Sequence, residues 1–321
     1  MVNTITSAVL RNIVPVWRSW PSSRAFSALP SAVLGHYSSN SDILHNIIKG
    51  INKKGLSSDT VTLKELASFD QFHIGGLPAT LTLFAELGIK PGDTVLDIGC
   101  GLGGPARACA STLGCRVVGV DINPEYIDVG NELSSWPCVG VQDRVSLHVG
   151  DAAAEGGLNA AAGVCDASID SAYMLHVGMN IEQKPLLAQA IYRALKPGGR
   201  FACFDLMSPA VPSTTPLVFP LPFASGPESC SLATAEQYKE AFFDAGFTLK
   251  RETNKLGFVT KAVAVNLGKL EEFASKNNGK LPPLTLAVVM GPSFEEKLKN
   301  CLLLFKGGGM TATELVWEKP K

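Results

Sequence analysis

The sequence has little charge and no excess of either sign. Its 321 residues include 28 Lys and Arg against 29 Asp and Glu, so the formal net charge is −1. A chain without a basic surplus offers no footprint for a polyphosphate backbone, which argues against nucleic acid as a partner. No uninterrupted apolar run approaches the roughly 18 to 20 residues that span a bilayer, so no transmembrane segment is expected. A hydrophobic content of 46% is ample for a large core.

Paired cysteine motifs are also missing. The eight cysteines show no CxxC pair and no regular spacing. They are typical of buried thiols in a reducing compartment and argue against a zinc site or a disulfide framework. The sequence therefore predicts a soluble protein without a metal site.

The first 41 residues lack lysine and acidic residues altogether, and they contain three arginines and nine serines instead. This composition is typical of an organellar transit peptide, and the run Arg24–Ser27 resembles a mitochondrial processing site. A secretory signal is disfavoured because no continuous apolar stretch of about 7 to 15 residues is present. We expect residues 1–41 to be a removable leader and the location to be mitochondrial, with a plastid as the alternative. An ordinary disordered tail is the structural alternative.

A glycine-rich loop follows the first predicted strand. Thr94–Ile98 is short and largely apolar, and it leads into Gly99, Gly101 and Gly104 in the spacing GxGxxG before a helix predicted over 105–113. Glycines at such a turn bring bare backbone N–H groups close to a ligand, because a Cβ would block the approach. By itself this loop leaves a nicotinamide or flavin enzyme open.

Three acidic residues near strand ends change the balance. Asp97 lies two residues before the first glycine, where a carboxylate can reach the amino group of an amino-acid ligand and where dinucleotide loops usually have an apolar residue. Asp121 ends the strand predicted over 116–120 and is placed to accept hydrogen bonds from both ribose hydroxyls. Asp151 follows the strand predicted over 145–149, in a position to bind an adenine amino group.

These motifs, in this order, resemble those of class I methyltransferases that use S-adenosylmethionine. VLDIGCGLGG resembles their motif I, VVGVDINP the second strand with its acidic end, HVGDAAA the adenine-contacting turn, and LKPGGRFACFDLM the turn and fifth strand. The resemblance implies an α/β fold: a doubly wound, mostly parallel, seven-stranded Rossmann-like sheet with an antiparallel last strand and helical lid insertions. S-adenosylmethionine is then the implied cofactor. Its implied contacts are Gln71, Asp97, Gly99, Cys100, Gly101, Gly103, Asp121, Ile122, Asp151, Ala152 and Leu175.

The resemblance also divides the chain into parts. Residues 78–207 are the cofactor-binding core, a helical cap over 42–77 precedes it, and residues 208–321 complete the domain. A helical insertion over about 255–308 would roof the site above the carboxyl ends of the strands, where ligands bind in such sheets. The apolar segment 281–290 is either part of this lid or a dimer surface, which leaves a homodimer open.

Three stretches outside the core motifs indicate a subfamily. Residues 70–80 (DQFHIGGLPAT), 172–181 (AYMLHVGMNI) and 219–232 (FPLPFASGPESCSL) resemble small-molecule enzymes of the sarcosine and dimethylglycine N-methyltransferase type, which make betaine. The resemblance implies methyl transfer to a small polar amine. The alternative is a C- or S-methyltransferase acting on a sterol, a tocopherol or quinol precursor, or a thioether acid; long aliphatic walls would favour a lipid. A non-catalytic cofactor-binding protein is the rival from another class.

His176, which ends the fourth predicted strand, is the candidate catalytic residue. Its structural alternative is a hydrogen bond to a backbone carbonyl. The sulfonium is already an activated methyl donor, so the reaction requires alignment and exclusion of water rather than a metal or a nucleophilic residue. Arg107 is expected on a solvated or salt-bridged helix face. Contacts with the methyl acceptor are assigned to His73, Tyr173, Met179 and Phe223.

Overall fold

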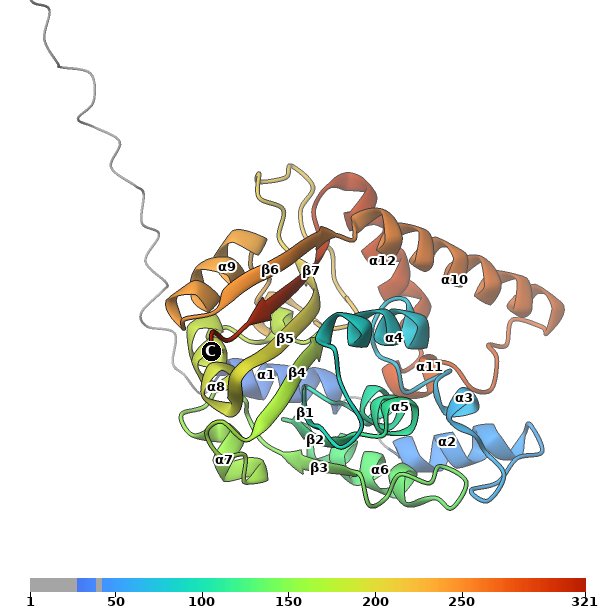
Figure 1. Ribbon diagram of the computed structural model, residues 1–321. Helices are drawn as coiled ribbons and strands as arrows, with labels where there is room; N and C mark the ends of the chain where they lie inside the picture. Colours follow the sequence, from blue (N-terminus) through green and yellow to red (C-terminus); the bar gives the residue numbers. More distant parts are fainter. Residues whose placement is uncertain (1–27, 39–41) are drawn as a thin grey trace, which may run out of the picture.

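A seven-stranded sheet forms the centre of the computed structural model, which describes residues 28–38 and 42–321 (Figure 1). The strands are β1 (Thr94–Ile98), β2 (Arg116–Asp121), β3 (Val145–Val149), β4 (Ile169–Leu175), β5 (Leu195–Met207), β6 (Thr248–Asn254) and β7 (Thr311–Glu318). Their order is β3-β2-β1-β4-β5-β7-β6. Strands β1 to β5 are parallel, whereas β7 pairs antiparallel with β5 and β6. The predicted doubly wound fold with an antiparallel last strand is confirmed.

Helices cover both faces of this sheet. Those of the core are α4 (Gly76–Leu87), α5 (Gly104–Leu113), α6 (Pro124–Ser135), α7 (Gly157–Ala162), α8 (Lys184–Ala194) and α9 (Ala235–Asp244). The first three pack on one face and the last three on the other. Strand side chains alternate between two cores, as in β4, where Tyr173 faces the α4–α6 layer and its neighbours Ala172 and Met174 face the opposite one.

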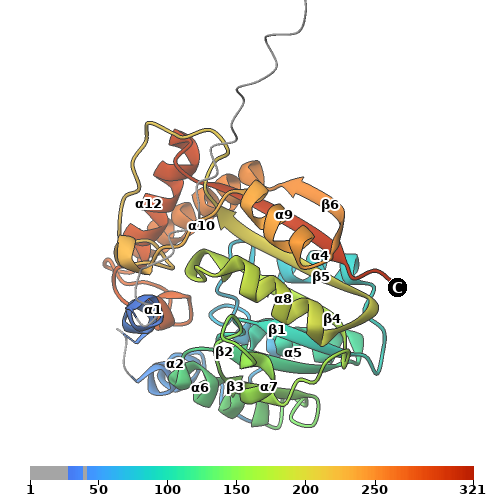
Figure 2. The same ribbon diagram turned by 90° about the vertical axis from the view of Figure 1, so that its left-hand side faces the viewer.

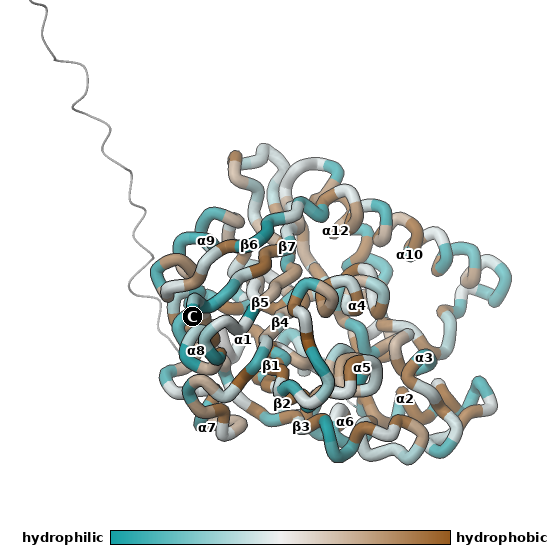
Figure 3. Tube along the Cα trace, viewed as in Figure 1, coloured by the Kyte–Doolittle hydropathy of each residue, from teal (hydrophilic) through white to brown (hydrophobic). Residues whose placement is uncertain are grey.

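The segment between β6 and β7 forms a helical roof, which matches the predicted insertion over 255–308. It consists of α10 (Leu256–Lys276), α11 (Ala287–Met290) and α12 (Phe294–Gly307). Hydrophobic residues recur along α10 among hydrophilic ones, as expected for a helix with one buried face (Figure 3). Two cap helices, α2 (Ile43–Asn52) and α3 (Leu63–Leu66), precede the core. The roof packs against α2 at Gly50, where an added Cβ would lie 2.6 Å from the Pro283 carbonyl.

Helix α1 (Ala28–Tyr37) lies inside the range predicted as a leader. It sits on the same side of the molecule as the roof, beyond the carboxyl ends of the strands (Figure 2). Val33 is buried, and the ring nitrogens of His36 are hydrogen-bonded to Ser225 Oγ at 2.7 Å and to the Pro222 carbonyl at 2.9 Å. The folded chain therefore begins before residue 42, earlier than the predicted boundary, because contacts with distant residues do not register in local composition.

The remainder of the predicted leader, including the processing run 24–27, lies outside the described residues. Within 28–38 and 42–321, no helix is long and apolar enough to cross a membrane.

Candidate functional site

A cavity of about 1500 Å³ lies between the carboxyl ends of the strands and the roof. The glycine loop after β1 and the residues that follow β2, β3 and β4 form its floor, and α10, α11 and α12 contribute to its upper wall. Ligands bind at this edge in open α/β sheets. Eight of the predicted cofactor contacts line the cavity: Gln71, Gly99, Gly101, Asp121, Ile122, Asp151, Ala152 and Leu175.

The glycine loop presents bare backbone to the cavity. Gly99 and Gly101 have positive φ angles of 68° and 53°, which side-chain-bearing residues rarely adopt. A Cβ at Gly99 would overlap the Val177 side chain, and one at Gly101 would lie 3.2 Å from the Phe72 ring. Glycine is therefore required here both by the backbone conformation and by the close approach of neighbouring groups.

Two carboxylates at strand ends already accept backbone hydrogen bonds. Asp121 accepts from the N–H of Gly101 at 2.8 Å through Oδ2 and from the N–H of Asn123 at 2.9 Å through Oδ1. Asp151 accepts from the N–H of Ala153 at 2.8 Å. A carboxylate has about four lone-pair sites, so both retain capacity for a ligand. Burial raises the pKa of Asp121, the two backbone donors acting in the opposite direction.

Three other predicted cofactor residues do not line the cavity. Asp97 is buried and accepts a hydrogen bond of 2.8 Å from the Tyr173 hydroxyl, and burial raises its pKa to about 7. Cys100 is buried in the core of the α4–α6 face. Gly103, with φ 74°, begins helix α5 and has no room for a Cβ against Leu147. These three residues face the protein interior and not the cavity.

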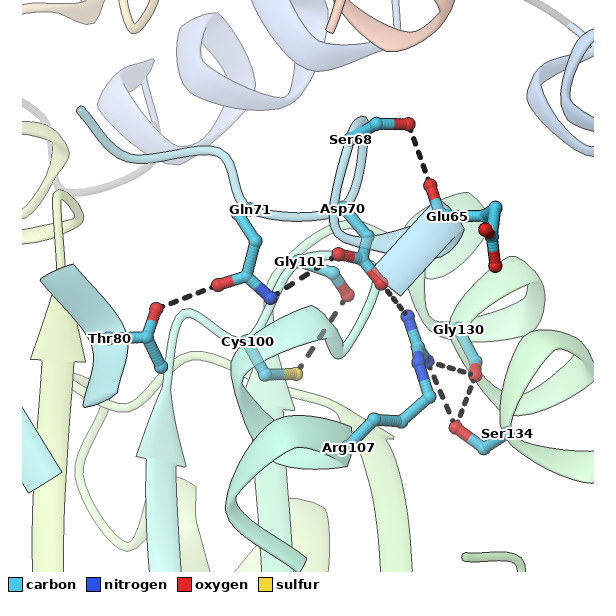
Figure 4. A network of polar contacts seen from close by, with 10 residues as sticks. All are labelled: Glu65, Ser68, Asp70, Gln71, Thr80, Cys100, Gly101, Arg107, Gly130 and Ser134. Atoms are coloured by element: carbon cyan, nitrogen blue, oxygen red, sulfur yellow. Dashed lines mark hydrogen bonds and ion pairs between the residues drawn. The ribbon is translucent and has the colours of Figure 1, made fainter. Parts of the chain in front are cut away.

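A buried polar network links helix α5 to the segment before α4 (Figure 4). Arg107 donates to Asp70 Oδ2 at 2.9 Å, and Gln71 donates to Asp70 Oδ1 at 3.3 Å. The Thr80 hydroxyl donates to Gln71 Oε1 at 2.7 Å and also contacts Nε2 of His73 at 2.9 Å. Each of these five residues is at most 4% exposed. Arg107 is thus salt-bridged as predicted, but it is fully buried rather than solvated.

Asp70 also occupies the start of helix α5. A Cβ at Gly104 would overlap both the carbonyl and the carboxylate of Asp70. In dinucleotide-binding loops of this spacing, the N-terminus of the helix receives the pyrophosphate. In this protein the Asp70 carboxylate fills that space, which argues against a nicotinamide or flavin dinucleotide as the ligand of the loop.

Two histidines lie together in the cavity wall. The rings of His73 and His176 have centroids 6.1 Å apart, and both residues line the cavity. His176 has a positive φ of 56°, unusual for a residue with a side chain, and its Nδ1 lies 3.0 Å from the Phe204 carbonyl. Burial lowers the pKa of His73 to about 4 and that of His176 to about 3, so both rings are neutral near neutral pH.

The remaining predicted acceptor contacts divide into two groups. Met179 and Phe223 line the cavity, as predicted. Tyr173 does not: its ring is fully buried, 5.0 Å from that of Phe84, and its hydroxyl is directed to Asp97. The cause is strand alternation, which turns Tyr173 toward the α4–α6 layer.

Several lining residues were not found from the sequence. Val33 and Tyr37 reach the cavity from α1, and Asn180 reaches it from the turn after β4. The Tyr37 ring packs against that of Tyr126, with centroids 5.8 Å apart. Local composition carried no signal for Tyr37, whereas Asn180 lies in the stretch 172–181 that had been singled out.

Known proteins share parts of this chain. Residues 95–199 match a family model described as a methyltransferase domain. The chain is similar to the sterol 24-C-methyltransferase of Eremothecium gossypii, with 40% identity over 118 residues covering 37% of this chain and 29% of that enzyme. It is also similar to phosphoethanolamine N-methyltransferase 1 of Arabidopsis thaliana, with 29% identity over 177 residues covering 54% of this chain and 32% of that enzyme.

A solved structure shares the fold over most of the chain. Phosphoethanolamine N-methyltransferase 2 of Haemonchus contortus superposes with a TM-score of 0.61 at 22% identity, covering 81% of this chain and 57% of that one. The aligned segments span about three tenths of the length of the two curated relatives.

Proposed function

We propose that this chain, which contains a class I S-adenosylmethionine-dependent methyltransferase domain, methylates a small molecule with a largely apolar body. The domain match and the fold support the cofactor and the type of reaction. The apolar lining of the roof is the observation on which the choice of an apolar methyl acceptor rests. The predicted sarcosine or dimethylglycine substrate, betaine formation and a mitochondrial location stay predictions.

The floor of the cavity fits S-adenosylmethionine. Asp121 and Asp151 retain acceptor sites suited to ribose hydroxyls and an adenine amino group, and the bare backbone at Gly99 and Gly101 allows close approach. S-adenosylmethionine supplies a methyl group already activated by the sulfonium. The residues of this chain would bind the cofactor, orient the methyl acceptor toward it and, because the cavity wall is largely buried, exclude water.

The cavity is larger than one ligand needs. Sites for single drug-sized ligands typically measure about 300 to 1,000 Å³, so about 1500 Å³ leaves room for a second molecule beside the cofactor. Sarcosine and dimethylglycine would leave most of the upper wall without contact, whereas a molecule with an extended hydrocarbon part would bury it. Burying apolar surface contributes roughly 25 cal/mol per Å².

The upper wall is aliphatic and carries no acidic residue among its described members. Helices α10 and α12 and the segment around α11 contribute Ala262, Val263, Val265, Asn266, Lys269, Leu286, Met290, Phe294 and Leu298. Carboxylates or aromatic faces stabilise a cationic amine product, and among its described residues this wall supplies only the ring of Phe294, because the lining residues Glu155 and Glu182 belong to other segments of the cavity. A phosphate group would need clustered Arg and Lys, but the wall has one exposed lysine. Leu286 and Met290 line the cavity, which supports a lid role for the segment 281–290.

His176 is the proposed polar group at the reacting centre. It directly follows β4 at the cavity floor, and burial keeps its ring neutral. We expect His176→Ala to lower the rate of methyl transfer much more than the affinity for the cofactor. Equal losses in both would indicate a structural role for the side chain.

The substrate proposal is tested with the full chain and methyl-labelled S-adenosylmethionine. One acceptor pool contains sterols and quinol precursors, and the other contains sarcosine, dimethylglycine, phosphoethanolamine and thioether acids. We expect label in the organic extract and identification of the product by mass spectrometry. Label confined to the polar pool would refute the apolar acceptor while retaining the reaction type.

A further inference from the structure

The hydrogen-bond partners of His73 fix which ring nitrogen carries its proton. Asp70 only accepts, so the amide nitrogen of Gln71 faces it and the amide oxygen faces Thr80. The Thr80 hydroxyl donates its one proton to the Gln71 amide oxygen. The hydroxyl oxygen can therefore only accept from Nε2 of His73. Nε2 also lies 3.1 Å from the Gly76 carbonyl, a second acceptor. In a neutral ring the proton is therefore on Nε2, and Nδ1 is bare.

His176 has the opposite tautomer for a similar reason. Its Nδ1 lies 3.0 Å from the Phe204 carbonyl, which can only accept, so Nδ1 carries the proton. Its backbone N–H donates to the same carbonyl at 2.8 Å and holds the left-handed backbone in place. Nε2 is left bare, and it is buried without a hydrogen-bond partner among the described residues. Strained backbone of this kind gathers at functional sites, where the surrounding structure fixes it.

Nε2 of His176 is the buried nitrogen that lacks a donor, and Nδ1 of His73 is a second unprotonated nitrogen on a neighbouring ring of the cavity wall. A buried acceptor without a partner is costly, and the cavity that both residues line is the route by which a donor can arrive. We infer that Nε2 of His176 accepts a hydrogen bond from a hydroxyl or N–H group of the methyl acceptor, and that Nδ1 of His73 is a second acceptor for such a group in the same wall. This inference rests on the proposed function and narrows its substrate class.

The pair discriminates by the chemistry of the group it faces. A phenolic or quinol hydroxyl, or a neutral N–H, donates its one proton to one of these unprotonated nitrogens. An ether or a plain alkene leaves them unpaired, and a carboxylate or phosphate presents lone pairs to lone pairs. Among apolar acceptors, the two histidines therefore favour molecules with a hydroxyl or N–H at the reacting end over hydrocarbons that lack one there.

The test uses three probes with one ring system: naphthol, its methyl ether and naphthoate. Each is titrated calorimetrically into the full chain saturated with S-adenosylhomocysteine. We expect naphthol to bind at least tenfold more tightly than the other two. His73→Phe and His176→Phe should each reduce this preference, and the double variant should abolish it. His45→Phe is the matched control, because His45 is exposed and lies outside the cavity.

A second readout does not depend on how the variants fold. Ring-nitrogen NMR of histidine-labelled wild-type protein should show one bare nitrogen in each ring, Nδ1 of His73 and Nε2 of His176, and both signals should shift on addition of naphthol. Equal binding of the three probes, no binding of naphthol, or a preference that survives in the double variant would overturn the inference. Failure of S-adenosylhomocysteine itself to bind would instead refute the proposed function.

Discussion

The Tyr37 hydroxyl donates a hydrogen bond of 3.0 Å to Oδ1 of Asn180, which joins helix α1 to the turn after β4. The amide nitrogen of Asn180 in turn donates to the carbonyls of Phe223 at 2.7 Å and Ser229 at 3.0 Å. One side chain therefore connects α1, the β4 turn and the loop after β5 around the cavity. Helix α1 is part of the candidate site, although its composition resembles that of a leader.

Removing residues 1–41 should weaken cofactor binding, because it deletes Val33 and Tyr37 from the cavity wall and uncovers Tyr126. The loss of one hydrogen bond and its packing predicts about a fivefold or larger rise in the Kd for S-adenosylhomocysteine. A chain that begins at Ser27 retains α1 and should match the full chain. Calorimetry measures the Kd for S-adenosylhomocysteine of all three chains. Equal values would contradict a role of α1 in cofactor binding.

This relationship also bears on the predicted leader. A leader that ends at the run 24–27 would leave α1 in place, whereas one that ends at residue 41 would remove it. We propose that any organellar leader ends before Ala28. N-terminal sequencing of protein recovered from the organelle would locate the end directly, and a mature chain starting after Ala28 would refute the proposal.

Breaking the buried ion pair between Arg107 and Asp70 should destabilise the fold strongly. Arg107→Met leaves the Asp70 carboxylate buried without its charged partner, and such changes cost about 3 to 5 kcal/mol. The double variant with Asp70→Leu should recover part of that loss. Urea unfolding of the single and double variants measures both effects.

The matched control for Arg107→Met is Lys276→Gln, which removes an exposed ion pair with Glu272 and should change stability little. If the urea midpoint of Arg107→Met equals that of the control, the buried ion pair does not stabilise the fold as expected.

Asp97 should make stability depend on pH. Burial raises its folded-state pKa to about 7, above the ordinary value of 3.8. The folded state thus holds this proton more tightly than the unfolded state, so the associated stabilisation is present at low pH and is lost as pH rises toward 7. Asp97→Asn removes this titration and can still accept from the Tyr173 hydroxyl.

We therefore expect Asp97→Asn to gain stability relative to wild type as the pH rises from about 4 to about 7, after which the difference should level off. Urea midpoints of the ligand-free proteins across this range measure it, and the other titrating groups cancel in the comparison. A difference that does not vary with pH would show that Asp97 has an ordinary pKa.

Sequence patterns predicted the central sheet well because its signals are local. The apolar run at Thr94–Ile98, the glycines after it and the acidic end of β2 each specify a strand, a tight turn or a ligand contact within a few residues. The N-cap of α6 is an equally local feature: the side chain of Asn123 accepts from the Glu125 N–H at 3.0 Å. The order of these elements then indicated the topology.

Such local patterns could not predict contacts between segments that are distant in the sequence. The pairing of Asp70 with Arg107 joins residues 37 positions apart, and the bond from Tyr37 to Asn180 spans 143. Tyr173 was assigned to the acceptor contacts, but strand alternation turns its side chain toward the α4–α6 layer. The roof was predicted as a helical insertion, whereas its aliphatic lining became evident only once α10, α11 and α12 were folded over the cavity.

We expect the cavity floor to bind the adenosine and amino-acid parts of S-adenosylmethionine and not a dinucleotide. The decisive experiment is calorimetric titration of the full chain with S-adenosylhomocysteine and, separately, with NAD. Only S-adenosylhomocysteine should bind, at least tenfold more weakly in Asp121→Ala and with unchanged affinity in Asp128→Ala, since Asp128 is exposed and lies outside the cavity. Binding of NAD, or full affinity for S-adenosylhomocysteine in Asp121→Ala, would contradict this expectation.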